Sequence, residues 1–501
     1  MDRIKLMVKD KNFIYVILAV LALFFACCIK DYDYDLFARL VVGEYFYNTG
    51  WISYKDFLSY TPTHLWYDHE WGASVIFYTF YKLFGNFGLI LVQAILMFLT
   101  TFFVIKTQRL QNKAYPPSVF FMALFLLLYS HQNPSLVRCH LFSFMFFSML
   151  LYFLEKTRLK NSKVLWLFLP IVIIWNNIHG GVVSGLGIIF VYFIGELISR
   201  KPCKKYLLTL LCSFPLLVIN PYGFDYLNFL LSANTKNREY VTEWWFVFAK
   251  RHVVYYYPLF FVGFFAVLAS INEFFNRKKI NITKLLVLLV TTILGTIHVK
   301  LLSLTVITVF SLYYSEIATY LRKEVVKKLN KICSVIVLLL VLYLPLTKPF
   351  IARVSVTKFP VKEVEFLKLN DIKGNIVTEF GLGSYVAYKL YPQVHIYFDG
   401  RYEECYYDEE FNNLLHFNLG DEQWDNVVKL YPTQILMPLI SIEVYNVIKN
   451  DSSWEEVYKG DVCAIFLPKN RQSYKKPFIL PSEDIRYYQK NEFEKNCKFG
   501  E

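Results

Sequence analysis

The sequence predicts an α-helical polytopic membrane protein that carries a small α/β domain near its C-terminal end. Two observations predict this fold class. The chain of 501 residues is 55% hydrophobic and 19% aromatic, which is more apolar than a typical soluble domain. Long apolar segments also recur as far as residue 347. Beyond residue 348 the pattern changes to short strand-like and helix-like segments that alternate.

About eleven transmembrane helices are predicted, because that many apolar segments approach the length that crosses a bilayer. They are 13–29, 86–105, 117–130, 136–155, 164–178, 181–198, 206–219, 253–275, 284–298, 301–320 and 332–347. A further segment, 71–84, is rich in aromatic residues and could span the membrane or lie flat at its surface. Treating it as interfacial leaves every Lys/Arg cluster between the segments on one side, as the positive-inside rule requires.

This topology predicts a multi-pass protein of the bacterial plasma (inner) membrane, with a cytoplasmic N-terminus. The predicted parts are a transmembrane domain at 1–348 with a first outer loop at 30–85, an extracytoplasmic α/β domain at 349–470, and a polar tail at 471–501. Within the α/β domain the pattern predicts strands at 375–379, 394–398 and 433–437, helices at 384–390, 408–416 and 441–449, and a hairpin at Val457–Leu467.

Charge and cysteine usage exclude two classes of function. The net charge is +13, yet the basic residues form short clusters between apolar segments, as cytoplasmic loops do, rather than a nucleic-acid footprint. The nine cysteines contain no CxxC pair and no His/Cys spacing of the kind that binds zinc. We therefore expect no nucleic-acid partner and no structural zinc.

Three carboxylates follow the first apolar segment directly: Asp31, Asp33 and Asp35. Charge next to a bilayer costs free energy, so such groups are candidates for function. A carboxylate can act as a general base or a metal ligand. Asp33 and Asp35 are the catalytic candidates, and the sequence leaves open which of them is the base. No cofactor is required, although two aspartates one residue apart could hold Mg²⁺ or Mn²⁺.

Other polar residues recur where the predicted helices reach the outer face, and they are candidates for substrate binding. Asp56, His69 and Glu70 lie in the first outer loop, and the others are Arg138, His140, His179, Glu243, His298 and Lys300. Each of them alone could equally be a helix cap or a side chain that reaches to water. As one layer, however, their cations could hold a lipid phosphate through charge-assisted hydrogen bonds.

Several short motifs, taken in order along residues 13–405, resemble bacterial GT-C-type polytopic membrane glycosyltransferase-like proteins. The motifs are Asp33-Tyr34-Asp35…Arg39…Gly43, Asp56-Phe57-Leu58-Ser59-Tyr60-Thr61, Trp66…His69-Glu70-Trp71, Arg138-Cys139-His140, Asn177-Ile178-His179-Gly180-Gly181, Asn220-Pro221-Tyr222-Gly223, Glu243-Trp244, Gly383-Ser384-Tyr385 and Phe398-Asp399-Gly400-Arg401. Each motif is short, so the ordered series carries the resemblance.

The resemblance implies a polyprenyl-phosphate-linked sugar donor and a glycan, lipid or protein acceptor on the outer face of the membrane. It also implies an acidic base after the first helix, a position that Asp33 and Asp35 match, and Glu70 as a second acidic group. Arg39 stands where the family has a histidine, and Cys139 stands where it has a proline. The resemblance thus predicts an integral membrane glycosyltransferase that inverts the anomeric carbon, with Arg39 among the substrate-binding residues.

Two other functions remain open from the sequence. One is a transporter or flippase of a lipid-linked or polar solute, which would need ionisable groups inside the helices or related halves of the chain. The other is a non-catalytic membrane assembly subunit whose C-terminal part binds a partner.

Overall fold

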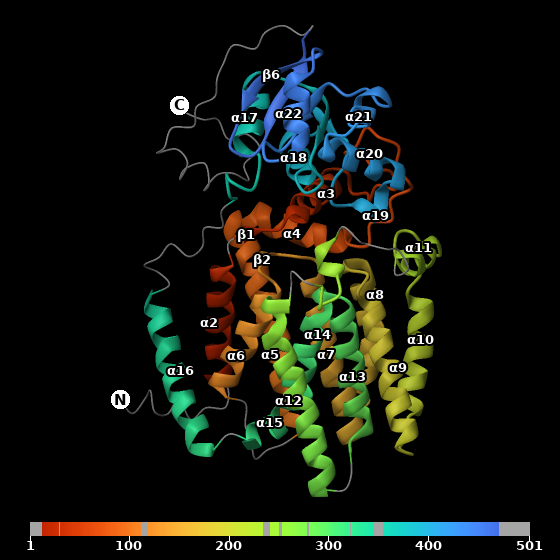
Figure 1. Ribbon diagram of the computed structural model, residues 1–501. Helices are drawn as coiled ribbons and strands as arrows, with labels where there is room; N and C mark the ends of the chain where they lie inside the picture. Colours follow the sequence, from red (N-terminus) through yellow and green to blue (C-terminus); the bar gives the residue numbers. More distant parts are fainter. Residues whose placement is uncertain are drawn as a thin grey trace. The chain divides into compact units, whose positions relative to one another are not determined.

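The chain forms two compact units in the computed structural model (Figure 1). The helical unit comprises Met1–Ile29 and Ile90–Phe350, and the mixed unit comprises Lys30–Leu89 and Ile351–Glu501. The structure describes residues 13–29, 31–111, 118–233, 241–249, 253–277, 280–320, 322–343 and 354–469. The predicted polar tail at 471–501 lies outside these residues.

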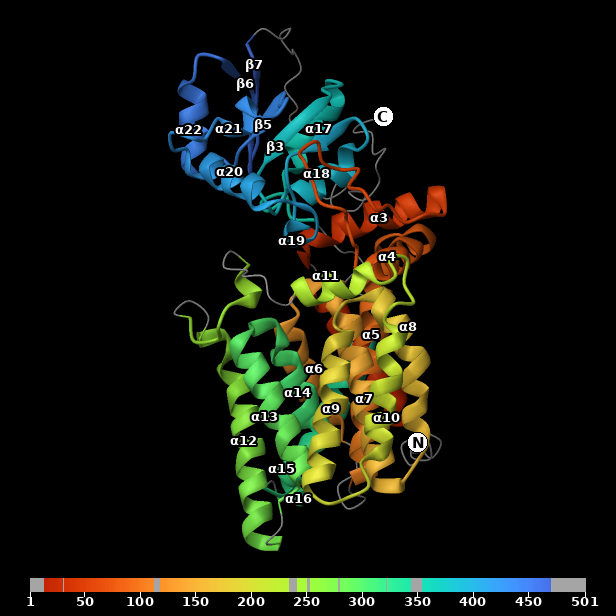
Figure 2. The ribbon, with the colours of Figure 1, turned by 90° about the vertical axis from the view of Figure 1, so that its right-hand side faces the viewer.

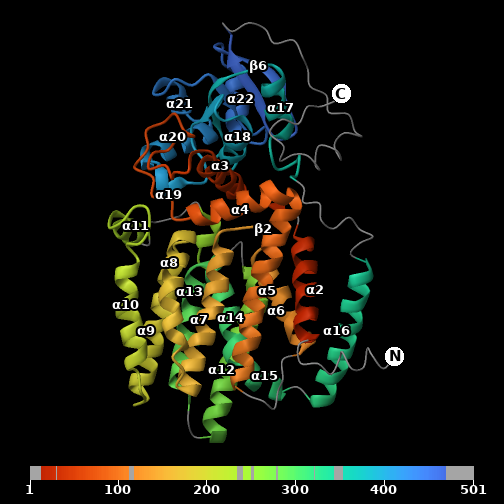
Figure 3. The same ribbon diagram turned by 180° about the vertical axis from the view of Figure 1, so that it is seen from behind.

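The helical unit is built from long helices that run alongside one another (Figures 2 and 3). Its elements are α2 (Phe13–Cys28), α5 (Asn86–Gln111), α6 (Val119–Gln132), β2 (Ser135–Leu136), α7 (His140–Lys160), η1 (Val164–Leu167), α8 (Phe168–Ile178), α9 (Val182–Ile198), α10 (Lys204–Leu216), α11 (Asp225–Ala233), η2 (Thr242–Trp244), α12 (Val253–Arg277), α13 (Ile282–Ile297), η3 (Val299–Leu301), α14 (Leu302–Leu312), α15 (Tyr314–Tyr320) and α16 (Lys323–Tyr343). Only the first four residues of α5 belong to the mixed unit.

The prediction of about eleven membrane spans is wrong. Among the described residues, α5 alone is long enough and apolar enough to cross a membrane, with a mean hydropathy of 2.4 over its best window. The other apolar helical segments among these residues have 10–17 residues, whereas a membrane span needs about 20. The predicted multi-pass placement in a bacterial inner membrane, with its cytoplasmic N-terminus and extracytoplasmic domain, is contradicted by the same finding.

The physical reason for the error is length. Helix α14, in a segment predicted to span the membrane, has 11 residues, and all of them are buried. A short apolar run cannot be told from a membrane span by composition alone. Close helix contacts accompany this packing: an added Cβ at Gly195 of α9 would collide with Thr283 of α13, so that glycine permits the two helices to approach.

Buried charges connect the ends of several of these helices. Glu155 of α7 accepts both hydrogen bonds from Arg158, at 2.8 and 2.7 Å, and a third from the Tyr192 hydroxyl of α9 at 2.8 Å. Lys284 of α13 donates to Gln111 Oε1 at 2.9 Å and to the Leu312 carbonyl at 2.8 Å. Because buried charges need partners, this network fixes how α5, α7, α9, α13 and α14 align.

The mixed unit is a five-stranded sheet with helices on both faces, joined by two helices from the N-terminal part of the chain. Its elements are β1 (Asp31–Tyr32), α3 (Tyr34–Thr49), α4 (Trp71–Phe84), α17 (Val361–Leu369), β3 (Gly374–Thr378), α18 (Gly383–Leu390), β4 (Val394–Ile396), α19 (Tyr402–Cys405), α20 (Asp408–Leu419), α21 (Asn426–Lys429), β5 (Ile435–Met437), α22 (Glu443–Asn450), β6 (Trp454–Lys459) and β7 (Ala464–Pro468). Helices α17 and α18 lie on one side of the strands, and α20–α22 lie on the other (Figure 2).

The strand order is β4-β3-β5-β7-β6. Strands β4, β3 and β5 are parallel, with Ile376 of β3 opposite both Ile396 and Ile435. Strand β7 is antiparallel to β5 and to β6. These elements confirm the predicted strands, helices and closing hairpin of this region. The prediction succeeded because short apolar runs between turn residues identify buried strands.

Residues 30–85, predicted as an outer loop, are instead part of this unit. The segment after α3 lies beside β4, where Tyr60 N donates to the Ile396 carbonyl at 3.2 Å and Ile396 N donates to the Leu58 carbonyl at 3.0 Å. Helix α3 packs on α18, with the Phe37 and Tyr385 rings edge to face at 5.0 Å. The ambiguous segment 71–84 forms helix α4.

Helices α3 and α4 approach closely at Gly43. An added Cβ there would collide with the Ser74 carbonyl and with Cβ of Tyr78 on α4. Glycine is required at such a crossing because any side chain would separate the two backbones. The crossing fixes the position of α4 relative to the sheet through α3.

Candidate functional site

Asp33 and Asp35, the predicted catalytic pair, have different environments. Asp33 is buried and is the N-cap of α3, where its Oδ1 accepts a hydrogen bond from Asp35 N at 3.1 Å. A carboxylate at this position satisfies a backbone N–H that the helix itself leaves without a partner. Asp33 therefore has a structural role that the sequence-based interpretation did not assign to it.

Asp35 is exposed in the first turn of α3. Its carboxylate lies against Gly400, where an added Cβ would collide with Asp35 Oδ1 and would lie 3.9 Å from Ser384 Oγ. Gly400 follows β4, and Ser384 lies in the first turn of α18, which follows β3. Asp35 is thus at the carboxyl ends of two adjacent parallel strands, the edge at which open α/β sheets bind their ligands.

A second carboxyl group lies at the same edge. Glu379 directly follows β3, and its Oε2 accepts from Gly381 N at 2.7 Å. Burial raises the pKa of Glu379, although hydrogen bonds from Gly381 and Leu382 act in the opposite direction. The Tyr34 ring lies against Gly381. The start of α3 therefore contacts the loops that follow both β3 and β4, and the sequence did not place Glu379 in this site.

Asp56, predicted to bind substrate, is instead part of a buried ion-pair network. Arg401 donates from Nη1 to Asp56 Oδ1 at 2.6 Å and from Nε to Asp399 Oδ1 at 2.9 Å. The side chains of all three residues are at most 2% exposed. Burial would raise the pKa of Asp56, but the Arg401 guanidinium outweighs it and lowers that pKa. The arrangement connects the first loop to the turn after β4.

Arg39 and Glu70 belong to a neighbouring network around Asp68. Arg39 Nη1 lies 2.5 Å from Asp68 Oδ1 and 3.6 Å from Glu70 Oε2, and the Glu70 N–H donates to Asp68 Oδ1 at 2.9 Å. Burial raises the pKa of Asp68, with Arg39 opposing it. Arg39 therefore stabilises a buried carboxylate.

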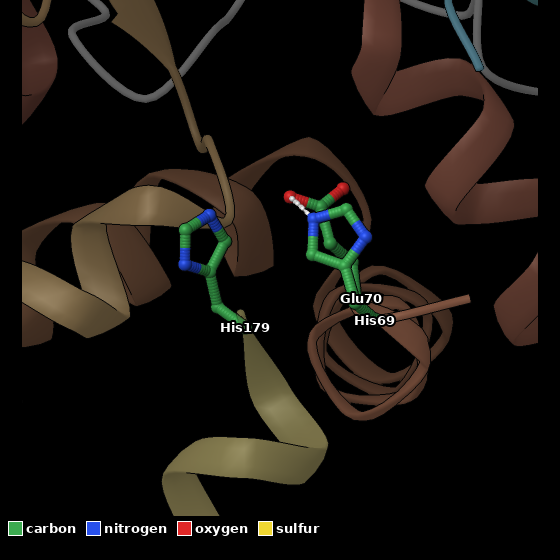
Figure 4. A group of neighbouring side chains, drawn as sticks. All are labelled: His69, Glu70 and His179. Carbon is green, nitrogen blue, oxygen red and sulfur yellow. Dashed lines mark ion pairs between the residues drawn. The ribbon is translucent and has the colours of Figure 1, made fainter. Parts of the chain in front are cut away.

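His69 lies between two carboxylates, and Figure 4 shows its ion pair with Glu70, at 3.8 Å between Nε2 and Oε1. Its Nδ1 lies 3.2 Å from Glu404 Oε1 on α19, and Trp66 Nε1 donates to Glu404 Oε2 at 3.1 Å. Burial would lower the pKa of His69, but Glu404 reverses this and raises it to about 9. In turn, His69 outweighs the effect of burial on Glu404 and lowers its pKa to about 2.

An aromatic pocket lies next to these networks, and the sequence-based reasoning missed it. Its interior volume of about 10 Å³ leaves room for about one water molecule. The walls come from α3, from the loop that follows it and from the start of α4: Tyr45, Phe46, Trp51, Phe57, Trp66 and Trp71, with Asp68 as the one charged group among the lining residues. The dense aromatic content of residues 45–71 was the available signal.

In the helical unit, three of the predicted residues lie together. Arg138 Nη2 pairs with Glu243 Oε2 at 2.7 Å, and Lys300 Nζ lies 3.6 Å from Glu243 Oε1. The Lys300 ammonium is 3.8 Å from the centre of the Trp244 ring. Burial would raise the pKa of Glu243, but Arg138 and Lys300 outweigh it and lower that pKa to about 2. Arg138, Glu243 and Lys300 form what we call the Glu243 cluster.

The histidines of the helical unit have separate partners. His140 Nε2 lies 2.8 Å from Asn133 Oδ1, and burial, reinforced by Arg138, lowers its pKa well below the usual value. His298 Nδ1 is 3.0 Å from the Trp244 carbonyl, beside the Glu243 cluster. His179, also labelled in Figure 4, ends α8 and accepts from Gly181 N at 2.8 Å. His179 is therefore a local cap within this unit.

The residues predicted to form one polar layer belong to both units, and whether they form a layer stays a prediction. Arg39, Asp56, His69 and Glu70 are in the mixed unit with Asp33 and Asp35, while Arg138, His140, His179, Glu243, His298 and Lys300 are in the helical unit. Within the described residues, no third His, Cys, Asp or Glu ligand joins Asp33 and Asp35 closely enough to hold a metal ion. A Mg²⁺ or Mn²⁺ ion there stays a prediction. No family model and no curated protein matches this chain.

Proposed function

We propose that the protein is a glycosyltransferase in which Asp35 is the general base. The observation that carries this proposal is the exposure of Asp35 at the carboxyl ends of β3 and β4, beside Gly400. Asp33 already caps a helix, and Asp56 is neutralised by Arg401. Asp35 is the one of these carboxylates that an incoming hydroxyl could reach.

The chemistry follows from a carboxylate in that position. The acceptor hydroxyl gives its proton to Asp35, and its oxygen forms a bond to the anomeric carbon of the donor sugar. The bond between that carbon and the donor phosphate breaks, and the phosphate leaves with the electron pair. Attack from the face opposite the phosphate inverts the anomeric centre. Loss of a positioned base reduces such a rate by about 10²–10⁴-fold.

The donor is proposed to carry its sugar on a polyprenyl phosphate, as the motif resemblance implies.

The test of the base uses the full-length purified protein and radiolabelled polyprenyl-phosphate sugars, with loss of label from the lipid as the measurement. Asp35→Asn should lower the rate at least about 100-fold. Asp33→Asn is the matched control, because asparagine caps a helix about as well as aspartate, so its rate should stay within about twofold of the wild type. Equal activity of wild type and Asp35→Asn would overturn the assignment of the base. No transfer with any donor, by protein shown to be folded, would favour a non-catalytic binding role.

A further inference from the structure

Three buried polar atoms of the mixed unit have no hydrogen-bond partner among the described residues. They are Tyr397 Oη, Glu410 Oε2 and Asn413 Nδ2, and their residues are 0%, 2% and 6% exposed. Native proteins leave few buried polar atoms without a partner, because each such atom costs free energy when it is removed from water. Tyr397, Glu410 and Asn413, which we call the Glu410 group, therefore need a partner from outside the described chain.

The side chains of the Glu410 group are neighbours although they come from two parts of the fold. Glu410 and Asn413 are three positions apart on α20, so they lie on the same side of that helix. Tyr397 directly follows β4, and its ring lies 5.8 Å from the ring of Tyr431. The Tyr431 hydroxyl in turn donates to Glu410 Oε1 at 2.7 Å. The group thus spans the space between α20 and the end of β4.

The electrostatic environment of Tyr397 agrees with this proximity. Burial raises the pKa of Tyr397, the charge of Glu410 adds to that effect, and the amide of Asn413 opposes it. Both neighbours therefore act on the phenol at short range. Even so, none of the three atoms makes a hydrogen bond to another member of the group.

Other contacts hold these side chains in place. Asn413 Oδ1 accepts from Asn426 Nδ2 at 3.0 Å, so its NH₂ group is left for a different partner. The ring of Tyr397 also meets the ring of Tyr60 edge to face at 5.9 Å. A side-chain rotation that gave the three atoms other partners within the protein would break these contacts and the bond from Tyr431 to Glu410.

The chemistry of the three atoms determines which molecule can partner them. A carboxylate oxygen only accepts hydrogen bonds, an amide NH₂ only donates them, and a phenol hydroxyl does either. A metal ion needs oxygen or other electron-pair donors around it and would be repelled by the amide hydrogens. An anion would be repelled by the carboxylate. The partner must therefore be a small neutral molecule that both donates and accepts.

We propose that the Glu410 group binds one water molecule inside the mixed unit. The water donates one hydrogen to Glu410 Oε2, accepts one hydrogen bond from Asn413 Nδ2, and forms a third hydrogen bond with the Tyr397 hydroxyl. Three hydrogen bonds are typical of a buried water. The water joins α20 to the chain after β4, and it requires nothing of the proposed transferase function.

A crystal structure of the full-length protein, at a resolution that shows ordered waters, tests the site directly. One isolated density peak should lie at about 2.7–3.2 Å from each of the three atoms. The proposal is overturned if there is no such peak, or if the three side chains bond to one another directly. It is also overturned if distances of about 2.0–2.6 Å to oxygen atoms identify a metal ion.

Variants show whether the Glu410 group is what holds the water. Tyr397→Phe leaves an acceptor and a donor in place, so the peak should remain. Glu410→Met combined with Asn413→Leu removes both of these and should expel the water. Glu409→Gln, at an exposed position of the same helix, is the control and should leave the peak unchanged. A peak that persists in the double variant would overturn the assignment, and if that variant does not fold, the wild-type and Tyr397→Phe structures still decide.

Discussion

Arg401 donates to Asp56 at 2.6 Å between two buried side chains that are 345 positions apart in the sequence. This pair joins the segment after α3 to the turn after β4. Arg401 also lies 4.7 Å from the centre of the Trp66 ring, so a single guanidinium connects the carboxylates and the aromatic wall of the pocket. The segment 31–89 and the C-terminal part of the mixed unit share a polar core at this point.

Removal of one partner of this pair should lower the free energy of unfolding of the mixed unit. Asp56→Asn leaves Arg401 with one carboxylate instead of two, and loss of one member of a buried pair costs about 3–5 kcal/mol. Denaturant unfolding of the full-length protein would measure this loss. The matched control is Lys358→Ala, which breaks an exposed pair with Asp31 in the same unit and should cost less than about 1 kcal/mol. Similar losses for both variants would show that the Asp56–Arg401 pair is not a core interaction.

Asp33→Ala should lower stability by about 1 kcal/mol, because it removes the N-cap of α3. Asp33→Asn should keep that stability, since the amide oxygen can accept from the same backbone N–H. Thermal unfolding of the two variants side by side gives the comparison. If Asp33→Ala were as stable as wild type, the cap assignment would be wrong, and Asp33 would again be a candidate base.

The pair of His69 and Glu404 should make the stability of the mixed unit depend on pH. The pKa of His69 is raised from about 6.5 in the unfolded chain to about 9 in the folded protein. Its contribution is therefore fully present below about pH 6.5 and is lost as the pH rises through 9. The pKa of Glu404 is lowered to about 2, so its contribution is present above about pH 4.5 and is lost as the pH falls through 2.

Between pH 5 and 6.5 the pair should contribute on the order of 2 kcal/mol, shared by both partners. Urea unfolding at pH 6 and at pH 9.5 would measure how much of this is lost. His69→Gln should remove the difference that this pair causes between the two pH values. A variant that loses stability between them as steeply as the wild type would assign the pH dependence to other groups.

The Glu243 cluster should behave as a coupled unit. Glu243 accepts from Arg138 in a partly buried position, and hydrogen bonds to charged groups are worth about 1.5–3 kcal/mol. In a double-mutant cycle of Arg138→Met and Glu243→Gln, the coupling free energy should therefore exceed 1 kcal/mol. A coupling free energy near zero would mean that the two side chains act independently. The Arg138–Glu243 pair would then not stabilise the helical unit.

The strands of the C-terminal domain could be predicted because their signal is local: short apolar runs such as 394–398 stand between turn residues. The pairing of Asp56 with Arg401 could not, since neither residue carries a sign of its distant partner. The roles of Asp33 and Asp35 look alike in sequence, and only the backbone geometry of α3 separates the cap from the exposed carboxylate. The span count failed because composition does not show where a helix ends, and most of the apolar helices among the described residues have only 10–17 residues.

Gly400→Ala should separate activity from stability at the proposed site. An added Cβ would collide with Asp35 Oδ1, and the carboxylate can move away because it is the end of a short side chain that solvent reaches. The expected cost in stability is therefore at most about 1 kcal/mol. Displacement of a reacting group by about 1 Å can cost about 100-fold in rate, so label transfer from the donor should fall by at least tenfold.

Gly187→Ala is the control, because nothing lies within 4 Å of its added Cβ. This variant should leave the rate unchanged and gain up to about 1 kcal/mol of stability from helix propensity. If Gly400→Ala keeps full activity although Asp35→Asn is inactive, the base does not need its position beside Gly400, and Asp35 must act from a different side-chain position.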